Sequence, residues 1–494
     1  MAILFLFFIL IANAIFLKFN AFRIFNLLDM GSYMDAGWRI LCGQRPYVDF
    51  IFHEGPVHIY MHAFFFQLFG FGKAAILAHL IVVHSIVISL VFFTLYRRTP
   101  IWATLAATLL TVPSFFWPIS HPWHDQSAFL WGTSALCLLL WQTPYRNSKH
   151  AFLTSMIVGM LVATSFLTKI NIGFAFGLAF VFIVLSTGYP KAGIGGYVLG
   201  GILGLLIILF LARAPVGFIE QLLLQAKASK VHGRLSNLLV FQDWFLNYYW
   251  VALILVLLDV VANPKRKKIF LVVFLGMTFV GLFALLTGGM RRTENIVFWG
   301  IQMMSAFLCM YDKSIVFKKI WQKKFHQSLI GILYLLVIFL TVLSVLKGLE
   351  LSVWYRAAGK DDANYYALKS EPLSGWRFHP WDGVPLDFFV KFIKENVPEE
   401  DSILNLADMY IIYALTQRDS YRGLPVIIWK DHIPVPGKQT EKVKKAFLSN
   451  PPDWIIIHPN SFQNEIVALD LVDVINTQYV PVYTMGNYHL FRKK

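Results

Sequence analysis

The sequence predicts a mainly α-helical, polytopic membrane protein with a small α/β domain at its C-terminal end. Three observations lead to this class. The 494 residues are 57% hydrophobic and 14% charged, whereas soluble globular proteins carry roughly 25% charged residues. Long apolar runs recur from residue 2 to residue 347, and the tail after them is mixed and polar. We therefore expect a transmembrane domain at 1–349 and an extracytoplasmic α/β domain at 350–494.

The apolar runs set the expected number of spans, because a spanning helix needs about 20 mostly apolar residues. The first run has no basic segment and no small-residue cleavage site, so we expect a retained helix rather than a signal peptide. The runs predict a bundle of about eleven spans, near residues 2–19, 74–95, 100–117, 126–142, 151–168, 171–188, 193–212, 245–262, 269–287, 296–311 and 328–347.

The basic residues of the short connections set the orientation. Cytoplasmic loops of membrane proteins carry an excess of Lys and Arg. With a cytoplasmic N-terminus, the connections on that side all carry Lys or Arg, at 96–100, 143–150, 188–193, 263–268 and 311–327. This topology accounts for much of the formal net charge of +15 without nucleic acid. We expect a multi-pass protein of the cytoplasmic (inner) membrane, in contact with its lipids, whose C-terminal domain is extracytoplasmic.

The tail contains short elements of both kinds. Residues 385–397 have helical spacing, and "DMYIIYALTQ" predicts a helix between the short strands "SILNLA" and "DWIIIHP". Residues 479–493 predict a hairpin with its turn at Gly486-Asn487. The tail has no Gly-rich phosphate loop, so we expect it to bind the acceptor or cover the outer cavity, with Trp376 and Trp381 exposed.

The first outer loop, about residues 20–72, is the most informative region. It opens with Asp29, directly after the first apolar run. Tyr33, Ala36, Gly37, Ile40 and Leu41 then recur at helical spacing, which predicts a short amphipathic helix lying in the membrane interface.

The rest of this loop predicts a second helix and a second acid. Gly43 ends the first helix, and an apolar helix follows Pro56 as far as Gly70. Glu54 stands just before this helix. We expect Asp29 and Glu54 to face water beside a lipid headgroup, and Asp35 to lie on the solvated face of the interfacial helix.

The order of residues in this loop resembles that of GT-C membrane glycosyltransferases. These enzymes use polyprenyl-phosphate-linked sugars and include protein O-mannosyltransferases and aminoarabinose transferases. The matching residues are Asp29, Tyr33, Ala36, Gly43, "PY" at 46–47, Asp49 and "HEGP" at 53–56. Aminoarabinose transferases have Glu-Lys-Pro-Pro where this chain has Glu54-Gly55-Pro56, and the missing lysine argues against that specific substrate. Asp125, after the third span, also matches an acid found in many members.

The resemblance implies an inverting glycosyltransferase. The donor would be a sugar on a polyprenyl phosphate, and the acceptor a lipid, a glycan or a protein. The first acid, Asp29, would be the general base that takes a proton from the acceptor hydroxyl, with Glu54 as a second catalytic acid. Further expected substrate-binding residues are Tyr33, Asp49 and Asp125.

The leaving phosphate needs a positive charge. Arg291 and Arg292 in "MRRTEN" carry permanent, bidentate charge, and Lys169 lies between two apolar runs on the same outer side. A divalent metal ion is the other candidate. Its possible ligands, His53, Glu54 and His124, match no standard metal spacing.

Several polar residues of the outer side also have a structural interpretation. Asp49 can cap the turn after "PY", and Asp125 can cap the fourth span. Arg291 and Arg292 can pair with Glu294, Lys169 can extend to the interface, and His58 can be an interfacial polar residue.

Two other functions compete with the enzyme. A flippase or transporter of lipid-linked saccharides predicts ionisable residues or helix breaks at mid-span in matched halves. Most charges here cluster at span ends instead. A non-catalytic scaffold for envelope assembly would depend on the tail rather than on the first outer loop.

Overall fold

The chain divides into two compact units. Unit 1 comprises residues 1–21, 80–207 and 234–359, and unit 2 comprises 22–79, 208–233 and 360–494. The first outer loop therefore groups with the tail, and the predicted boundary at 349/350 lies outside the described residues. The computed structural model describes residues 2–22, 25, 27, 29–52, 54–96, 98–116, 121–142, 148–186, 191–212, 216–220, 252–254, 256–257, 268–287, 299–311, 339, 365–423, 438–458 and 471–494.

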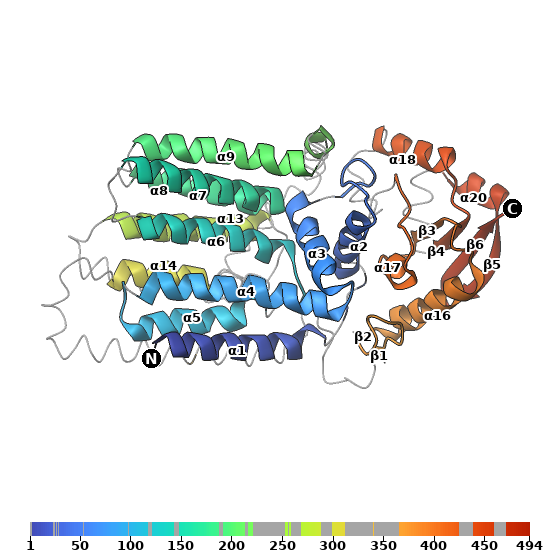
Figure 1. The fold of residues 1–494 in the computed structure, drawn as a ribbon, viewed down its shortest axis with the longest axis horizontal. Coiled ribbons are helices and arrows are strands. Elements are labelled where there is room, and N and C mark those ends of the chain that lie inside the picture. The colour runs from blue at the N-terminus through green and yellow to red at the C-terminus, as the bar shows by residue number, and fades with distance from the viewer. Residues whose placement is uncertain are drawn as a thin grey trace, which may run out of the picture. The chain divides into compact units, whose positions relative to one another are not determined.

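Unit 1 is a bundle of apolar helices (Figure 1). Each helix overlaps a predicted span, whereas the predicted spans at 245–262 and 328–347 fall mostly outside the described residues. The helices are α1 (Ala2–Ala21), the larger part of α4 (Lys73–Tyr96), α5 (Ile101–Phe115), α6 (His124–Gln142), α7 (Ser148–Thr168), α8 (Ile170–Ser186), α9 (Lys191–Leu211), α13 (Lys268–Thr287) and α14 (Trp299–Tyr311).

Several of these helices suit a bilayer. Among the described residues, four helices, α1, α4, α7 and α9, have the length and apolar composition needed to cross a membrane. The others are apolar but shorter, or fall below that limit. The multi-pass class is supported in this way, while the number of about eleven spans stays a prediction.

Small residues bring α7 and α9 into close contact. Gly196, Gly200 and Gly204 recur every four residues and form one buried stripe of α9. A Cβ atom on Gly200 would lie 1.9 Å from the carbonyl oxygen of Met156, and one on Gly196 would lie 2.2 Å from that of Phe152. Membrane helices associate through such stripes because lipid supplies no hydrophobic drive between them.

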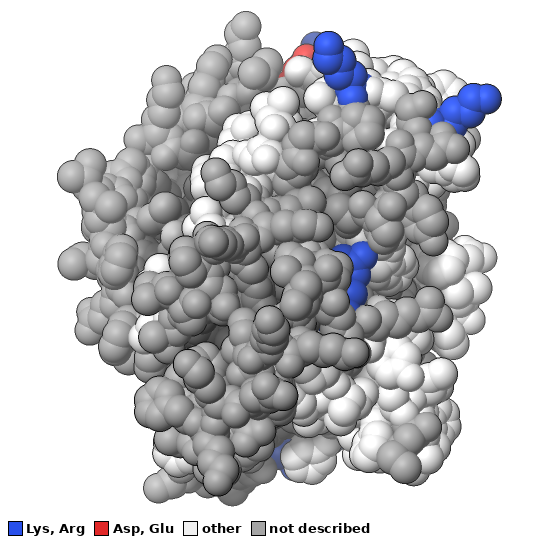
Figure 2. Space-filling model, turned by 90° about the vertical axis from the view of Figure 1, so that its left-hand side faces the viewer, with Lys and Arg blue, Asp and Glu red and all other residues white. Residues whose placement is uncertain are grey.

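Figure 2 shows the face at the left-hand end of Figure 1. Among the described residues on this face, Lys and Arg side chains (blue) outnumber Asp and Glu side chains (red). Lys149 and Lys191 lie in the first turns of α7 and α9. An excess of Lys and Arg is also what the sequence shows in the predicted cytoplasmic loops. The side of the membrane on which these loops lie stays a prediction.

Unit 2 contains both helices of the first outer loop. The predicted helices are confirmed as α2 (Asp29–Leu41) and α3 (Pro56–Phe69). Proline is favoured in the first turn of a helix, where its missing N–H has no partner to lose, and Pro56 occupies that place. Gly43 and Gly70 follow the two helices with positive φ angles of 78° and 74°, which glycine adopts without steric cost.

The tail folds as predicted, as a small α/β domain within unit 2. Its four-stranded sheet has the order β3-β4-β6-β5, with β3 parallel to β4 and the remaining pairs antiparallel. The Gly486-Asn487 turn joins the predicted hairpin. The elements are β1 (Tyr366–Ala367), β2 (Arg377–Phe378), α16 (Pro380–Asn396), β3 (Ile403–Leu406), α17 (Ile412–Thr416), α18 (Lys438–Ser449), β4 (Trp454–Ile457), α20 (Val472–Gln478), β5 (Tyr479–Met485) and β6 (Tyr488–Lys493).

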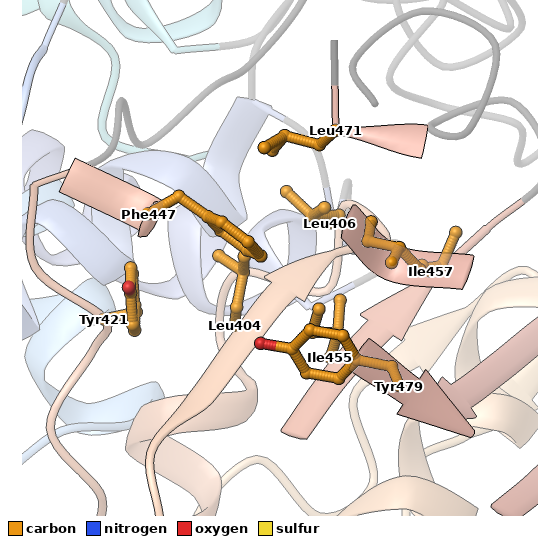
Figure 3. Packing of buried hydrophobic residues seen from close by; sticks show 9 residues of the cluster. Leu404, Leu406, Tyr421, Phe447, Ile455, Ile457, Leu471 and Tyr479 are labelled. Atoms are coloured by element: carbon orange, nitrogen blue, oxygen red, sulfur yellow. The ribbon is translucent and has the colours of Figure 1, made fainter. Parts of the chain in front are cut away.

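One face of this sheet carries a hydrophobic core (Figure 3). Side chains alternate between the two faces of a strand, so Leu404 and Leu406 of β3 point to the same side as Ile455 and Ile457 of β4. Phe447 of α18 packs against them. Asn405 and Ile456 point to the opposite face of the sheet and do not belong to this core.

The expected exposure of the tail's tryptophans is half right. Trp381 is 66% exposed, as predicted, but Trp376 is fully buried. Its indole packs edge-on against Phe22 and Phe25, with ring centroids 5.1 and 4.8 Å apart. Sequence reasoning missed this because the partners of Trp376 come from the first outer loop, more than 300 residues away.

The contact between α7 and α9 predicts that substitutions at two glycines of α9 change the stability of the protein differently. Gly200→Ala should lower the free energy of unfolding by about 1–3 kcal/mol, because the added methyl group meets backbone that cannot move alone. Gly195→Ala is the matched control, since a Cβ there meets nothing within 4 Å. Thermal unfolding in detergent measures both variants, and equal melting temperatures would contradict this packing.

Candidate functional site

The first turn of α2 carries the proposed base. Asp29 is the first residue of this helix and is partly exposed. Its carbonyl oxygen accepts a hydrogen bond of 2.8 Å from the hydroxyl of Ser32. Tyr33, one turn further on, is only 1% exposed and packs edge-on against Phe52 and His58. Tyr33 thus fixes the helix that carries Asp29 against Phe52 and α3.

The environment of Asp35 differs from the sequence prediction. It was expected on a solvated face, but it is completely buried and so are most residues of α2. Its carboxylate pairs with Arg39 at 2.7 Å and accepts a hydrogen bond of 2.6 Å from Ser420. Burial raises the pKa of Asp35, against the opposing effect of the Arg39 guanidinium. The polar face of α2 therefore meets the tail, where an interfacial helix would have met water.

Backbone oxygens of the tail extend this contact. Arg39 donates to the carbonyl of Tyr421 at 2.7 Å, and Gln44 donates to that of Ser420 at 2.5 Å. Trp38 donates to the carbonyl of Arg418 at 2.8 Å. Within unit 2, the segment 418–421 is thus fixed to α2 and to the turn that follows it. Neither Arg39 nor this segment was singled out from the sequence.

The turn between α2 and α3 holds two more predicted acids. Asp49 accepts a hydrogen bond from the backbone N–H of Arg45 at 2.8 Å and pairs with its side chain at 3.2 Å. This is the turn-capping role weighed above. Glu54 is partly exposed, and its carbonyl accepts a hydrogen bond from the hydroxyl of Tyr47. Tyr47 itself has a φ of 64°.

The histidines after Glu54 are also placed differently from the prediction. His58 was expected in the interface, but it is fully buried. Its Nε2 lies 3.2 Å from Nε2 of His62 on the next turn of α3, and His79 is 4.9 Å from His62 between ring centroids. A spacing of four residues in a helix was the available signal for the first pair.

In unit 1, three predicted site residues come together. Asp125 and His124 open α6, and Lys169 lies between α7 and α8. Lys169 forms an ion pair with Asp125, and its Nζ lies 2.7 Å from Nε2 of His124. All three side chains are buried. Asp125 and Lys169 were expected at the substrate and His124 at a metal, and the structure joins them in one polar cluster.

Lys169 lies at the centre of this cluster. An ammonium group has three protons to donate and no lone pair. Its Nζ lies 2.7 Å from Nε2 of His124, and the same ring nitrogen lies 3.2 Å from a carboxylate oxygen of Asp125. The same ammonium reaches Asp125. Asp125 and His124 together hold the cation in place.

The remaining predicted residues lie outside the described part of the chain. They are His53, Arg291 and Arg292. Across the described ranges, no group of three His, Cys, Asp or Glu side chains is arranged to hold a metal ion. The divalent ion expected from His53, Glu54 and His124 therefore stays a prediction.

The buried pair in α2 predicts a large loss of stability. Asp35→Asn should cost about 3–5 kcal/mol, because the guanidinium of Arg39 stays buried without its anion. The control is Glu395→Gln in the exposed pair with Lys391, which should change stability by at most ~0.5 kcal/mol. Denaturation in detergent measures both, and an unchanged Asp35→Asn protein would show that the pair is not needed.

Comparison with known proteins places the fold. No protein-family model matches the sequence, and no curated protein matches it. A crystal structure of ArnT from Cupriavidus metallidurans bound to undecaprenyl phosphate matches with a TM-score of 0.57 and 12% identity, over 98% of this chain and 97% of that chain. The apo state of the same protein matches with a TM-score of 0.51 and 13% identity, over 98% and 96%.

A third solved structure is more distant. It is the oligosaccharyltransferase of Archaeoglobus fulgidus in complex with Zn and sulfate, with a TM-score of 0.49 and 13% identity, over 98% of this chain and 73% of that chain. The matches to ArnT agree with the resemblance noted in the first outer loop. The chain therefore has the fold of ArnT along nearly its whole length.

Proposed function

We propose that this protein is an integral membrane glycosyltransferase. It moves a sugar from a polyprenyl-phosphate-linked donor to a lipid, glycan or protein acceptor on the outer face of the cytoplasmic membrane. The observation that carries this proposal is the fold shared with ArnT bound to undecaprenyl phosphate, over 98% of the chain. Asp29, the first residue of α2, and Glu54, two residues before α3, support it.

Asp29 is the proposed base. The acceptor oxygen attacks the anomeric carbon while its proton passes to the Asp29 carboxylate, so that a new glycosidic bond forms. The bond between the anomeric carbon and the phosphate oxygen breaks, and the polyprenyl phosphate leaves with that electron pair. A single displacement of this kind inverts the anomeric centre. A carboxylate that is partly exposed on a rigid helix suits this role.

Glu54 is the proposed partner of Asp29. It is partly exposed and lies two residues before α3, which packs against α2. In this role, the Glu54 carboxylate accepts a hydrogen bond from a second hydroxyl group of the acceptor substrate. This hydrogen bond orients the attacking oxygen. Asp49 and Tyr33, by contrast, act through the shape of the loop, since one caps a turn and the other is buried.

Lys169 is the proposed cation for the leaving phosphate. Asp125 and His124 hold its Nζ in place, and an ammonium group can donate up to three hydrogen bonds, one of which we assign to a phosphate oxygen. A fixed cation aimed at developing negative charge stabilises the transition state without reorganisation. Arg291 and Arg292 are further candidates for this charge. A divalent ion, if bound, would supply the same charge stabilisation.

Replacing the base tests the catalytic assignment. Asp29→Asn should lower kcat by roughly 10²–10⁴-fold, because the amide cannot take the proton. Its melting temperature and its binding of undecaprenyl phosphate should stay unchanged. The control is Asp473→Asn at an exposed position of the tail. The assay is transfer of labelled sugar in proteoliposomes, and full activity of Asp29→Asn would reject Asp29 as the base.

The buried cation needs a double variant, because removing Lys169 alone leaves Asp125 without its counter-charge. Lys169→Met should be unstable, and Lys169→Met with Asp125→Asn should recover folding. We expect the double variant to keep a kcat lower by roughly 10²–10³-fold, as when one group facing a developing charge is lost. Wild-type turnover in the folded double variant would show that this ion pair is only structural.

A further inference from the structure

The carboxyl end of the parallel strands in the tail carries a group of polar side chains that the proposed reaction does not use. Asp408 follows β3, His458 follows β4, and Tyr488 begins β6. Asp382, in the first turn of α16, completes the group. Asp382, Asp408 and His458 are partly exposed, so a ligand can reach them. In open α/β sheets, ligands bind at this end of the strands.

Tyr488 contacts two members of this group, and Asp408 lies near enough to act on Asp382 electrostatically. The Tyr488 hydroxyl lies 3.5 Å from a carboxylate oxygen of Asp382, and its ring centroid is 4.7 Å from that of His458. The hydroxyl of Tyr410 donates to Asp408 at 2.7 Å. Burial and the nearby charge of Asp408 raise the pKa of Asp382 to about 6. The two carboxylates therefore share one neighbourhood.

Asn405 supplies an independent sign of a ligand. It is 7% exposed, and its side-chain Nδ2 has no hydrogen-bond acceptor in the described ranges. Its Oδ1 accepts from the backbone N–H of Ala407, so the amide is turned toward the carboxyl end of β3, where Asp408 follows. By strand alternation it shares a sheet face with Ile456, Leu490 and Tyr488. Among the described residues, Asn405 thus has a buried donor without an acceptor at the end of β3 where this group lies.

This end of the tail also contacts the helix of the proposed base. A Cβ atom built on Gly31 of α2 would lie 3.8 Å from Cβ of Tyr410 and 3.7 Å from a methyl group of Ile411. Gly31 is two residues from Asp29, and the hydroxyl of Tyr410 bonds to Asp408. All of these residues belong to unit 2. Tyr410 therefore links the polar group to the first turn of α2.

We infer that the carboxyl end of β3 and β4 is a saccharide-binding site, in which Asp382, Asp408 and Asn405 hold the hydroxyls of a glycan acceptor. Saccharide binding at this site is independent of the proposed function. The role of the site in binding the acceptor rests on the proposed function. The site narrows the acceptor class from lipid, glycan or protein to a molecule that presents sugar hydroxyls to the tail.

The chemistry of the side chains favours a sugar. Carboxylates accept hydrogen bonds from hydroxyl groups, and the Asn405 amide donates one to a hydroxyl oxygen. Trp381, one residue before Asp382, is 66% exposed and stacks on His379 with ring planes 7° apart. This exposed aromatic face can cover the apolar face of a sugar ring. A metal ion is the other ligand for two carboxylates, but no three-ligand group is found within the described residues.

Direct binding tests the site on the full-length chain in detergent micelles, with an array of printed oligosaccharides as the probe. We expect binding to a subset of glycans. Asp408→Asn should weaken it about tenfold to a hundredfold, since a hydrogen bond to a charged group is lost. Asparagine tolerates the positive φ of 54° at this position, so the fold is kept. Tyr488→Phe is a second variant with the same expected direction, and Asp473→Asn is the control.

The result on the array decides the site. No glycan binding by the wild type, or equal binding by Asp408→Asn and the control, would overturn the inference. Titration with CaCl₂ is run in parallel, because Ca²⁺ binding without glycan binding would also overturn it in favour of a cation site. These outcomes do not depend on whether the protein transfers sugar.

Kinetics then tests the acceptor role. With a bound glycan as the acceptor, Asp408→Asn should raise the acceptor KM by the same factor as its loss of binding, with kcat and the donor KM unchanged. A lower kcat at an unchanged acceptor KM would contradict a binding role. If neither protein transfers sugar while the wild type binds glycans, the proposed function fails and the site stands.

Discussion

The buried pair of Asp35 and Arg39 is the constraint on which the rest of unit 2 depends. Both charged side chains are buried, and the free-energy cost of removing them from water is offset only if fixed partners satisfy their hydrogen bonds. Ser420 and the carbonyl of Tyr421 are those partners. The tail must therefore close over α2 in one arrangement. Asp29 belongs to the same helix, so the contact between α2 and the tail also holds the helix that carries the proposed base.

The sequence predicted the elements of this protein better than their environments. Apolar runs and turn residues located the helices of unit 1, α3 and the hairpin at Gly486, because these signals are local. Asp35, His58 and Trp376 were predicted to be accessible and are buried. In each case the covering partner is decided by tertiary contact: Ser420 for Asp35, and Phe22 for Trp376. A polar helix face looks the same in sequence whether it meets water or a polar surface of protein.

The candidate site shows the same division. The loop pattern indicated Asp29 and Glu54; Asp29 is the first residue of α2, and Glu54 lies two residues before α3. Asp125, His124 and Lys169 were selected separately, for different roles, and the structure joins them in one cluster. Sequence could not pair them, since Lys169 follows α7 while the other two open α6. Asn405 and Asp408 were not selected at all, because single polar residues near short strands carry no pattern of their own.

The central claim is that this chain breaks the bond between a sugar and a polyprenyl phosphate. The most direct measurement uses the purified protein in liposomes with an undecaprenyl-phosphate-linked sugar and an acceptor glycan, followed by mass spectrometry of the lipids. We predict that free undecaprenyl phosphate appears as the sugar-linked lipid disappears, and that the acceptor gains the mass of one sugar. Movement of the intact sugar-linked lipid across the bilayer, with no undecaprenyl phosphate released, would contradict the account and identify a transporter.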